Sequence, residues 1–166
     1  MICPVCGFTN IQGDDNCENC GADLRTADIP QPADAFEARL AGEHLAVIGA
    51  AEPLVVSSST PVGDAIRLMQ EQRNGCVVVV DDGVITGVFT ERDAVMKVAG
   101  TGTDGVTVGE VMTHDPVVLR PDDSAAVAIH KMAVGGFRHI PLVDGSRPLG
   151  VATARDLLRH IEHLLG

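Results

Sequence analysis

The chain has 166 residues, which is enough for one compact domain and a small appendage. Hydrophobic residues make up 45% of it but aromatic residues only 2%, so aliphatic side chains must build the core and enclose any bound ring. The net charge of −11, without clustered Lys and Arg, argues against a nucleic-acid partner. No apolar run approaches the ~20 residues that span a membrane, and no secretory signal is visible, so we expect a soluble, cytoplasmic protein.

Four cysteines near the N-terminus form two C-x-x-C-G sequences, at residues 3–7 and 17–21. Four thiolates on two tight turns make a closed tetrahedral site that suits structural Zn²⁺, and the glycine after each pair lets the backbone turn. Two disulfides, a redox dithiol and a rubredoxin-like iron site are the alternatives, which the missing signal sequence, the doubled motif and the lack of an aromatic core disfavour. The pattern resembles a zinc ribbon over residues 1–24. Its predicted zinc ligands are Cys3, Cys6, Cys17 and Cys20.

The charge of this N-terminal segment bears on its role. Residues 1–24 contain Asp15, Glu18 and Asp23 among their acids and no Lys or Arg. A zinc ion held by four thiolates adds further negative charge, so such a ribbon would repel a nucleic acid. We therefore expect it to contact a protein or to support folding.

The next residues lead from the ribbon to the main body of the chain. Residues 25–33 carry two prolines and few apolar side chains, which predicts a linker. Residues 34–48 have apolar side chains near helical spacing, which predicts a helix. The predicted divisions of the chain are a ribbon at 1–24, a linker and helix at 25–42, and two repeated domains at 43–103 and 104–166.

From residue 53 the pattern alternates between strands and helices. A short strand at 53–56 is followed by Thr60 and Pro61, a helix cap and a first-position proline that open a helix to about Arg73. The apolar run at 77–80 predicts a buried strand, followed by a strand at 85–89 and a helix at 91–98. After a connector at 100–105, a short helix at 106–112 leads into a second set of the same elements.

Residues 53–93 and 116–156 are two copies of one segment, related without a gap by a shift of 63 positions. Their densest identity is Gly-Val-x-Thr-x-Arg-Asp, which ends at Asp93 and again at Asp156. Neither copy is long enough to bury a good core alone, so we expect the copies to pack as one pseudo-two-fold pair. The predicted fold is therefore α/β, with two β-α-β-β-α units whose equivalent loops face a shared cleft.

The repeated Thr-x-x-Asp has two compatible interpretations. Thr90 with Asp93, and Thr153 with Asp156, follow a strand and open a helix, and a threonine cap with an acid three residues later is close to a capping box. Such boxes are common where no ligand binds. Alternatively, the hydroxyl and free helix amides meet a phosphate while the carboxylate holds both hydroxyls of a ribose. A ligand would meet the side of the carboxylate that faces the cleft.

The doubled Gly-h-x-Thr-x-x-Asp motif, where h is hydrophobic, resembles that of a cystathionine-β-synthase (CBS) domain pair. Residues 136–144 before the second motif, and residues 111–118 at the start of the second copy, match the same family. The resemblance covers residues from about 43 to 166. It implies an adenosyl ligand (AMP, ADP, ATP or S-adenosylmethionine) in the cleft, a homodimer, and a regulatory role for another protein.

Two ligand sites follow from this resemblance. In the first, Asp93 would hold the ribose with help from Thr90, while the other copy would line the adenine. In the second, the same roles fall to the second motif, with phosphate contacts from the segment before it. The implied residues are Thr90, Asp93, Thr113 and Val117 for the first site, and Arg138, His139, Pro141, Thr153 and Asp156 for the second.

The two copies differ at positions that matter for these sites. Gly75 and Cys76 stand where Arg138 and His139 stand in the second copy, so we expect the first site to lack phosphate-facing cations. Arg155 repeats an arginine beside the first motif and is a further candidate contact, with an exposed helix face as the equal alternative. We expect Cys76 to be a buried apolar residue, because no histidine accompanies it in the motif.

These inferences favour a non-enzymatic regulatory protein, in which the cleft senses an adenosyl ligand and the ribbon contacts an unidentified regulated partner. The alternative is a zinc-ribbon protein of transcription or nucleic-acid metabolism that uses the pair only to dimerise, and the charge distribution disfavours it. An enzyme is the weakest hypothesis, since neither an open metal site nor a Ser/His/Asp or Cys/His set is visible.

Overall fold

The computed structural model describes residues 2–3, 5–10, 15–24, 32–48, 50–100 and 102–165. The linker predicted at 25–33 lies mostly outside these ranges. Helices α1 (Ala35–Gly42) and α2 (Leu45–Ile48) come first. The first repeat then contains β1 (Val55–Val56), α3 (Val62–Glu71), β2 (Cys76–Asp81), β3 (Val84–Thr90), α4 (Glu91–Asp93) and a π-helical turn, η1 (Ala94–Val98). The second region contains α5 (Val108–Val111), β4 (Thr113–His114), α6 (Ala125–Gly135), β5 (His139–Asp144), β6 (Arg147–Thr153) and α7 (Ala154–Leu165).

The sheets confirm the predicted pair of β-α-β-β-α units. β1 pairs in parallel with β2, and β2 pairs antiparallel with β3. β5 and β6 form the equivalent hairpin, and a bridge from Leu119 to Leu142 is parallel, like the pair of Val56 with Val79 63 residues earlier. Both hairpins also have a register shift at the same place, after Val79 and after Leu142. The repeat in the sequence is therefore a repeat in backbone pairing.

Each repeat completes the sheet edge of the other. β4, which leads into the second repeat, pairs with β3, and Ala51, which leads into the first, bridges to Val151 in β6. These crossings explain the glycine of the repeated motif. A Cβ at Gly87 would lie 2.9 Å from the carbonyl oxygen of Thr113, and a Cβ at Gly150 would lie 2.5 Å from the Cβ of Ala50. Only glycine leaves room for the crossing segment.

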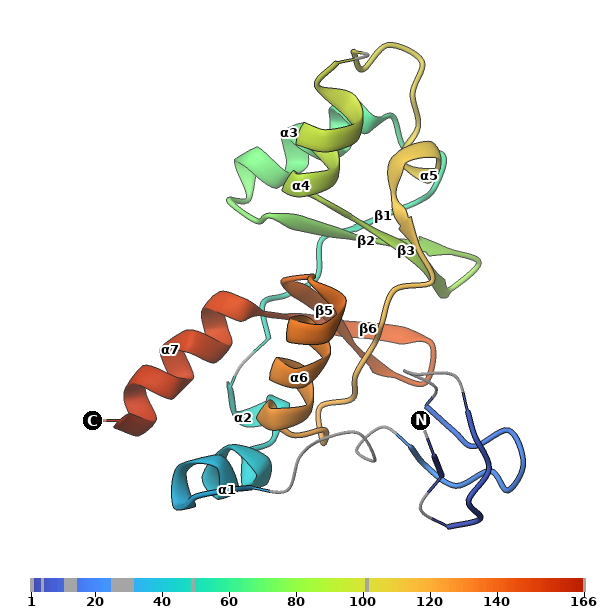
Figure 1. The fold of residues 1–166 in the computed structure, drawn as a ribbon. Helices are drawn as coiled ribbons and strands as arrows, with labels where there is room; N and C mark the ends of the chain where they lie inside the picture. Colours follow the sequence, from blue (N-terminus) through green and yellow to red (C-terminus); the bar gives the residue numbers. More distant parts are fainter. Residues whose placement is uncertain are drawn as a thin grey trace.

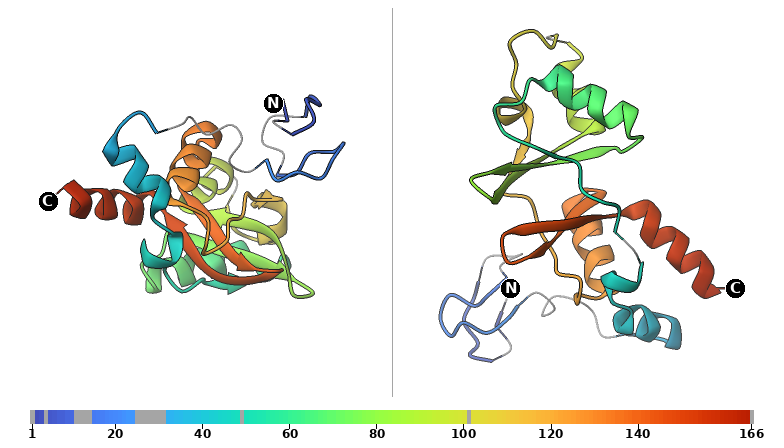
Figure 2. Two further views of the ribbon diagram at one scale, coloured as in Figure 1. Left: turned by 90° about the horizontal axis from the view of Figure 1, so that it is seen from below. Right: turned by 180° about the vertical axis from the view of Figure 1, so that it is seen from behind.

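The two sheets lie next to each other at the centre of the molecule, with the helices of each repeat on its outer side (Figures 1 and 2). Each repeat has its own apolar core, one around Val77, Val79 and Phe89 and the other around Ile140, Leu142 and Leu157. Aliphatic side chains dominate both cores, as the composition predicts. Leu40 and Leu45 from α1 and α2 belong to the second core, so the N-terminal helices pack on the second repeat.

The single helix predicted at 34–48 is wrong, because the chain breaks between α1 and α2. Glu43 is extended, and its carbonyl oxygen accepts a hydrogen bond from the amide of Ala125 at 2.8 Å. The amide of Leu45 donates to the carbonyl of Asp123 at 2.9 Å. The helical spacing of apolar side chains continues through the break, but the backbone groups there form hydrogen bonds with the turn that precedes α6.

Two other local predictions need correction. Thr60 does not cap α3, which begins after Pro61 without a side-chain cap, because the Thr60 hydroxyl accepts from the amide of Ser57 at 3.1 Å and closes the preceding turn. The helix predicted at 91–98 changes from α4 to η1, where the amide of Ala99 donates to the carbonyl of Ala94. Single π-helical turns of this kind are frequent at functional sites.

Across the parts of the chain that the structure describes, none of the helices combines the length and apolar character needed to cross a bilayer.

Candidate functional site

The four N-terminal cysteines lie together as one cluster. Their sulfur atoms are all within 4.8 Å of one another, with 3.7 Å between Cys3 and Cys20 and 3.6 Å between Cys6 and Cys17. A tetrahedron of zinc–sulfur bonds of about 2.3 Å has edges of about 3.8 Å, so the cluster has the size that Zn²⁺ requires. The donor set, four thiolates and no open position, is that of a structural site.

Two equivalent turns hold these sulfurs. Gly7 and Gly21 both have positive φ, 73° and 70°, and each amide donates to the carbonyl of the first cysteine of its pair. The predicted role of these two glycines is confirmed. Asn10 joins the turns, because its side-chain oxygen accepts from the amide of Glu18 at 3.0 Å. Leu24, fully buried against Cys3 and Cys17, gives the cluster a small core of its own.

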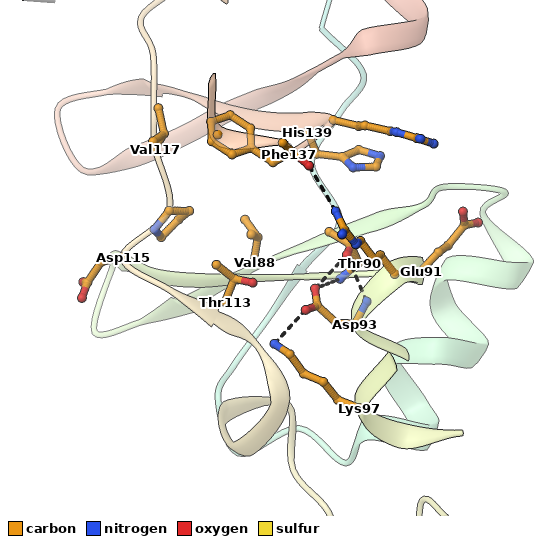
Figure 3. A pocket seen from close by; sticks show the side chains of 15 residues that line it. Val88, Thr90, Glu91, Asp93, Lys97, Thr113, Asp115, Val117, Phe137 and His139 are labelled. Carbon is orange, nitrogen blue, oxygen red and sulfur yellow. Dashed lines mark hydrogen bonds and ion pairs between the residues drawn. The ribbon is translucent and has the colours of Figure 1, made fainter. Parts of the chain in front are cut away.

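A second candidate site is a cavity of about 790 Å³ between the repeats (Figure 3). The first repeat contributes its Thr-x-x-Asp turn, and the second contributes the segment after β4 and the residues just before and at the start of β5. The lining residues are Val88, Thr90, Glu91, Arg92, Asp93, Lys97, Thr113, Asp115, Pro116, Val117, Gly135, Gly136, Phe137, Arg138 and His139.

Asp93 is held at the floor of this cavity and is 8% exposed. One carboxylate oxygen, Oδ2, accepts from the amide and the hydroxyl of Thr90 at 3.0 and 2.7 Å, which completes a capping box. The other oxygen, Oδ1, lies 2.8 Å from the ammonium group of Lys97. The capping interpretation of the motif is confirmed, and ligand binding by Asp93 stays a compatible prediction because the same carboxylate lines the cavity.

The walls of the cavity are apolar and come from both repeats. Val88 lies on β3, while Pro116, Val117 and Phe137 come from the second repeat (Figure 3). Such surfaces can enclose a planar ring between a polar floor and a charged rim. No role for Phe137 was predicted from the sequence, although it lies inside the 136–144 segment that matches the family. Aromatic residues are rare in this chain, so an aromatic side chain in that segment was a sign that could have identified it.

Comparison with known proteins decides the family. The CBS-domain family model matches residues 48–100 and 108–163. The chain belongs to the CBS-domain family. The CBS domain-containing protein YhcV of Bacillus subtilis is 34% identical over 103 residues, which are 61% of this chain and 74% of YhcV. The Arabidopsis thaliana protein CBSCBSPB3 is 31% identical over 101 residues, but the match spans only 18% of that longer protein and 59% of this chain.

Solved CBS structures share the fold. A putative signal-transduction protein with CBS domains from Burkholderia ambifaria has 30% sequence identity and a TM-score of 0.66, covering 71% of this chain and 93% of that one. The CBS pair of protein MJ0100, solved with 5′-methylthioadenosine and S-adenosylmethionine, has 22% identity and a TM-score of 0.64, covering 74% of this chain and 99% of the other. At that identity the likeness to MJ0100 shows the fold alone.

The structure groups the residues predicted for the two ligand sites differently from the sequence. Arg138 and His139, which the sequence assigned to the site of Asp156, line the Asp93 cavity. The expectation that the first site lacks phosphate-facing cations is therefore wrong, since Arg92, Lys97 and Arg138 all line it. The shift by 63 positions compares residues within each repeat, whereas the cavity is built across the repeats.

His139 is neutral near physiological pH in this environment. Burial lowers the pKa of its imidazole, and the neighbouring Arg138 charge lowers the pKa further, while Glu91 and Asp156 oppose both effects. The ring can therefore donate or accept a hydrogen bond in the cavity without adding a charge.

The second CBS motif repeats only part of the Asp93 arrangement. The hydroxyl of Thr153 donates to Oδ2 of Asp156, whose amide donates back to that hydroxyl at 3.1 Å. Arg159 is 3.5 Å from Oδ1 of Asp156 and mostly exposed. Arg155 is exposed on α7, and Pro141 is buried in β5, so the structure brings neither to the Asp93 cavity. Ligand contacts by Pro141, Thr153, Arg155 and Asp156 remain predictions.

Cys76 is buried, as predicted for an apolar residue. Burial and the negative charge of Asp93 raise the pKa of its thiol to about 12. The thiol is therefore protonated and inaccessible, which is the opposite of a reactive nucleophile.

Proposed function

We propose that this chain is a non-enzymatic regulatory protein that senses an adenosyl ligand, AMP, ADP, ATP or S-adenosylmethionine, between its CBS repeats. The observation that carries the proposal is the cavity that joins Thr90 and Asp93 of one repeat to Thr113 and Val117 of the other. A carboxylate at the floor suits a ribose diol, and the aliphatic and aromatic walls suit a purine. The MJ0100 structure, which contains 5′-methylthioadenosine and S-adenosylmethionine, is consistent with this proposal only in showing that a protein of the same fold can hold such ligands.

A ligand held between two repeats can act as a signal. It contacts both halves at once, so it favours whichever arrangement of the repeats fits it best, in proportion to its difference in affinity. CBS-domain proteins are typically regulatory, and the proposal needs no catalytic group from the cavity.

Calorimetric titration with AMP, ATP and S-adenosylmethionine tests sensing. The wild type should bind one of them with micromolar affinity, and Thr113→Val and Asp93→Asn should each weaken that binding about tenfold or more. Arg67→Gln is the control, because Arg67 forms an exposed ion pair with Asp64 outside this cavity. Loss of binding in Asp156→Asn alone would assign the ligand to the second predicted site. Absence of heat with all three ligands would leave the Thr-x-x-Asp turns as helix caps and the repeats as a scaffold.

For the N-terminal segment we propose a structural Zn²⁺ held by Cys3, Cys6, Cys17 and Cys20, and contact with the regulated protein. The fit of the sulfur cluster to zinc supports the first part, and the absence of Lys and Arg in residues 1–24 supports a protein over a nucleic acid. Metal analysis of the purified chain should give one zinc per molecule, lost in Cys6→Ser. Retention on heparin would instead favour the nucleic-acid alternative.

We also propose that the chain forms a homodimer, as its family resemblance implies, and that it acts in the cytoplasm. Sedimentation equilibrium measures the mass of the assembly directly. A mass of one chain across the micromolar range would contradict the dimer.

A further inference from the structure

Lys97 is a cavity residue with no counterpart in the second repeat. It lies on η1, one turn after Asp93, and its side chain is 42% exposed toward the cavity (Figure 3). The equivalent position 63 residues later is His160, whose Nε2 lies 3.6 Å from Glu43 on the N-terminal segment. Only the first repeat therefore places a cation against its motif carboxylate from this position.

The ammonium group of Lys97 connects the motif to the other repeat's lead-in segment. It lies 2.8 Å from Oδ1 of Asp93 and donates to the carbonyl oxygens of Val111 at 2.8 Å and Met112 at 3.4 Å. Those carbonyls end α5, directly before β4 and Thr113. Lys97 thus neutralises the buried carboxylate and also holds the segment that lines the cavity.

A ribose diol competes with this contact. A carboxylate has about four acceptor positions, and on Asp93 two of them accept from Thr90 and one from Lys97. Two ribose hydroxyls need two positions, so a bidentate grip displaces Lys97 from Oδ1. The lysine stem is long and flexible, and the displaced ammonium stays in the cavity beside the ligand.

The charge balance of the cavity depends on this one residue. Its lining contains three cations, Arg92, Lys97 and Arg138, and three anions, Glu91, Asp93 and Asp115, with His139 neutral. The sum is zero with Lys97 and −1 without it. A displaced ammonium attracts an anionic group attached to the ribose, and it repels a positively charged sulfonium.

We propose that Lys97 is a displaceable counter-ion that makes the Asp93 cavity select a phosphorylated adenosine over the uncharged nucleoside and over S-adenosylmethionine. This inference rests on the proposed function, because it names which member of the adenosyl class the cavity takes. Lys97 acts as a specificity-determining residue, whereas Thr90 and Asp93 are common to every ligand of the class.

Calorimetry with adenosine, AMP and S-adenosylmethionine tests the proposal on the full chain. The wild type should bind AMP most tightly, and K97Q should reduce the preference for AMP over adenosine roughly tenfold. K97R should retain the preference, because it keeps the charge. R67Q is the control, since Arg67 forms an exposed ion pair with Asp64 at 2.9 Å outside the cavity and should behave as the wild type.

A second measurement does not depend on any variant. Raising the salt concentration should weaken AMP binding to the wild type and leave adenosine binding nearly unchanged, because salt screens charge interactions. An unchanged AMP preference in K97Q, equal salt dependence of the two ligands, or tightest binding of S-adenosylmethionine would each overturn the role of Lys97 and leave sensing intact. Absence of binding by all three ligands would overturn the proposed function as well.

Discussion

Asp93 and Asp156 occupy equivalent positions in two copies of one motif, and each accepts a hydrogen bond from the threonine three residues before it. Their surroundings nevertheless differ. Asp93 also accepts from the Thr90 amide, pairs with Lys97 and faces the cavity between the repeats. The side chain of Asp156 is 21% exposed and lies 3.5 Å from the exposed Arg159. A repeated motif therefore defines the local turn, while residues from elsewhere decide what the carboxylate can do.

The largest expected effect concerns the glycine that both repeats share. Gly87→Ala and Gly150→Ala should each destabilise the fold by about 1–3 kcal/mol, because a Cβ would meet the segment crossing from the other repeat. Gly63→Ala is the control, since its Cβ would lie 3.7 Å from Thr103 and helix α3 favours alanine. Urea denaturation gives the three free energies of unfolding. A neutral Gly150→Ala would mean that only the first crossing is tight.

The next effect separates the two carboxylates. Asp93→Asn should lower the free energy of unfolding by about 1–2 kcal/mol, because the neutral amide oxygen is a weaker acceptor for the two bonds from Thr90 and the amide NH2 group, a donor, faces the ammonium group of Lys97. Asp156→Asn should cost about half as much, since its carboxylate is more exposed. Thermal unfolding of both variants without ligand measures the difference. Equal losses would show that the capping box alone accounts for stability.

A smaller effect concerns His139, which occupies the position of Cys76 in the first repeat. Its folded-state pKa lies below the unfolded value near 6.5, so the unfolded chain binds the proton first as pH falls. Stability from this group is fully present above pH 6.5 and declines as pH falls toward the lower, folded-state pKa. Urea denaturation between pH 8 and pH 5 should show a steeper loss for the wild type than for His139→Gln. Parallel profiles would contradict the neutral state of this half-buried ring.

The smallest effect is an expected lack of reaction at Cys76. After chelation of zinc, a thiol reagent should modify the four ribbon cysteines and leave Cys76 unmodified until the chain is denatured, because its thiol is buried and its pKa is raised to about 12. Cys76→Ala should show the same number of fast-reacting thiols as the wild type. A fifth fast thiol in the native wild type would show that the first repeat opens readily at this position.

Much of this architecture could be predicted from the sequence because equivalent positions of the two repeats adopt the same backbone structure. A shift of 63 positions identified the strands, the turns and the motif glycines, and the spacing of Cys3, Cys6, Cys17 and Cys20 predicted one sulfur cluster. Two local departures from the regular pattern could not be predicted in this way. The break at Glu43 and the turn closed by Thr60 arise from backbone bonds to distant or neighbouring segments that apolar spacing does not reveal.

The candidate site was less predictable for a physical reason. A motif predicts which residues adopt the same turn, but not which side chains of the other repeat lie opposite it. Arg138 and His139 were grouped with Asp156 alone, although both line the Asp93 cavity while His139 also pairs with Thr153, and the cavity residues Lys97 and Phe137 were missed. The pairing of β4 with β3 brings Thr113 to the Asp93 site, as predicted, whereas Arg138 and His139 reach the cavity from the start of β5, which no local pattern indicates.

The exchange of sheet edges has a consequence for the chain as a polymer. Cut in the connector near residue 102, the first half would lose β4 from the edge of β3, and the second would lose Ala51 from the edge of β6. An unpaired strand edge exposes backbone N–H and C=O groups that can pair with another strand. Two separated halves would re-form the native pairing only by finding each other, and two intact chains could trade halves through the same edges. The arrangement that builds the cavity is thus also a route to domain swapping, and the covalent connector, which gives each half a high effective concentration of the other, is what keeps both halves of the site in one molecule.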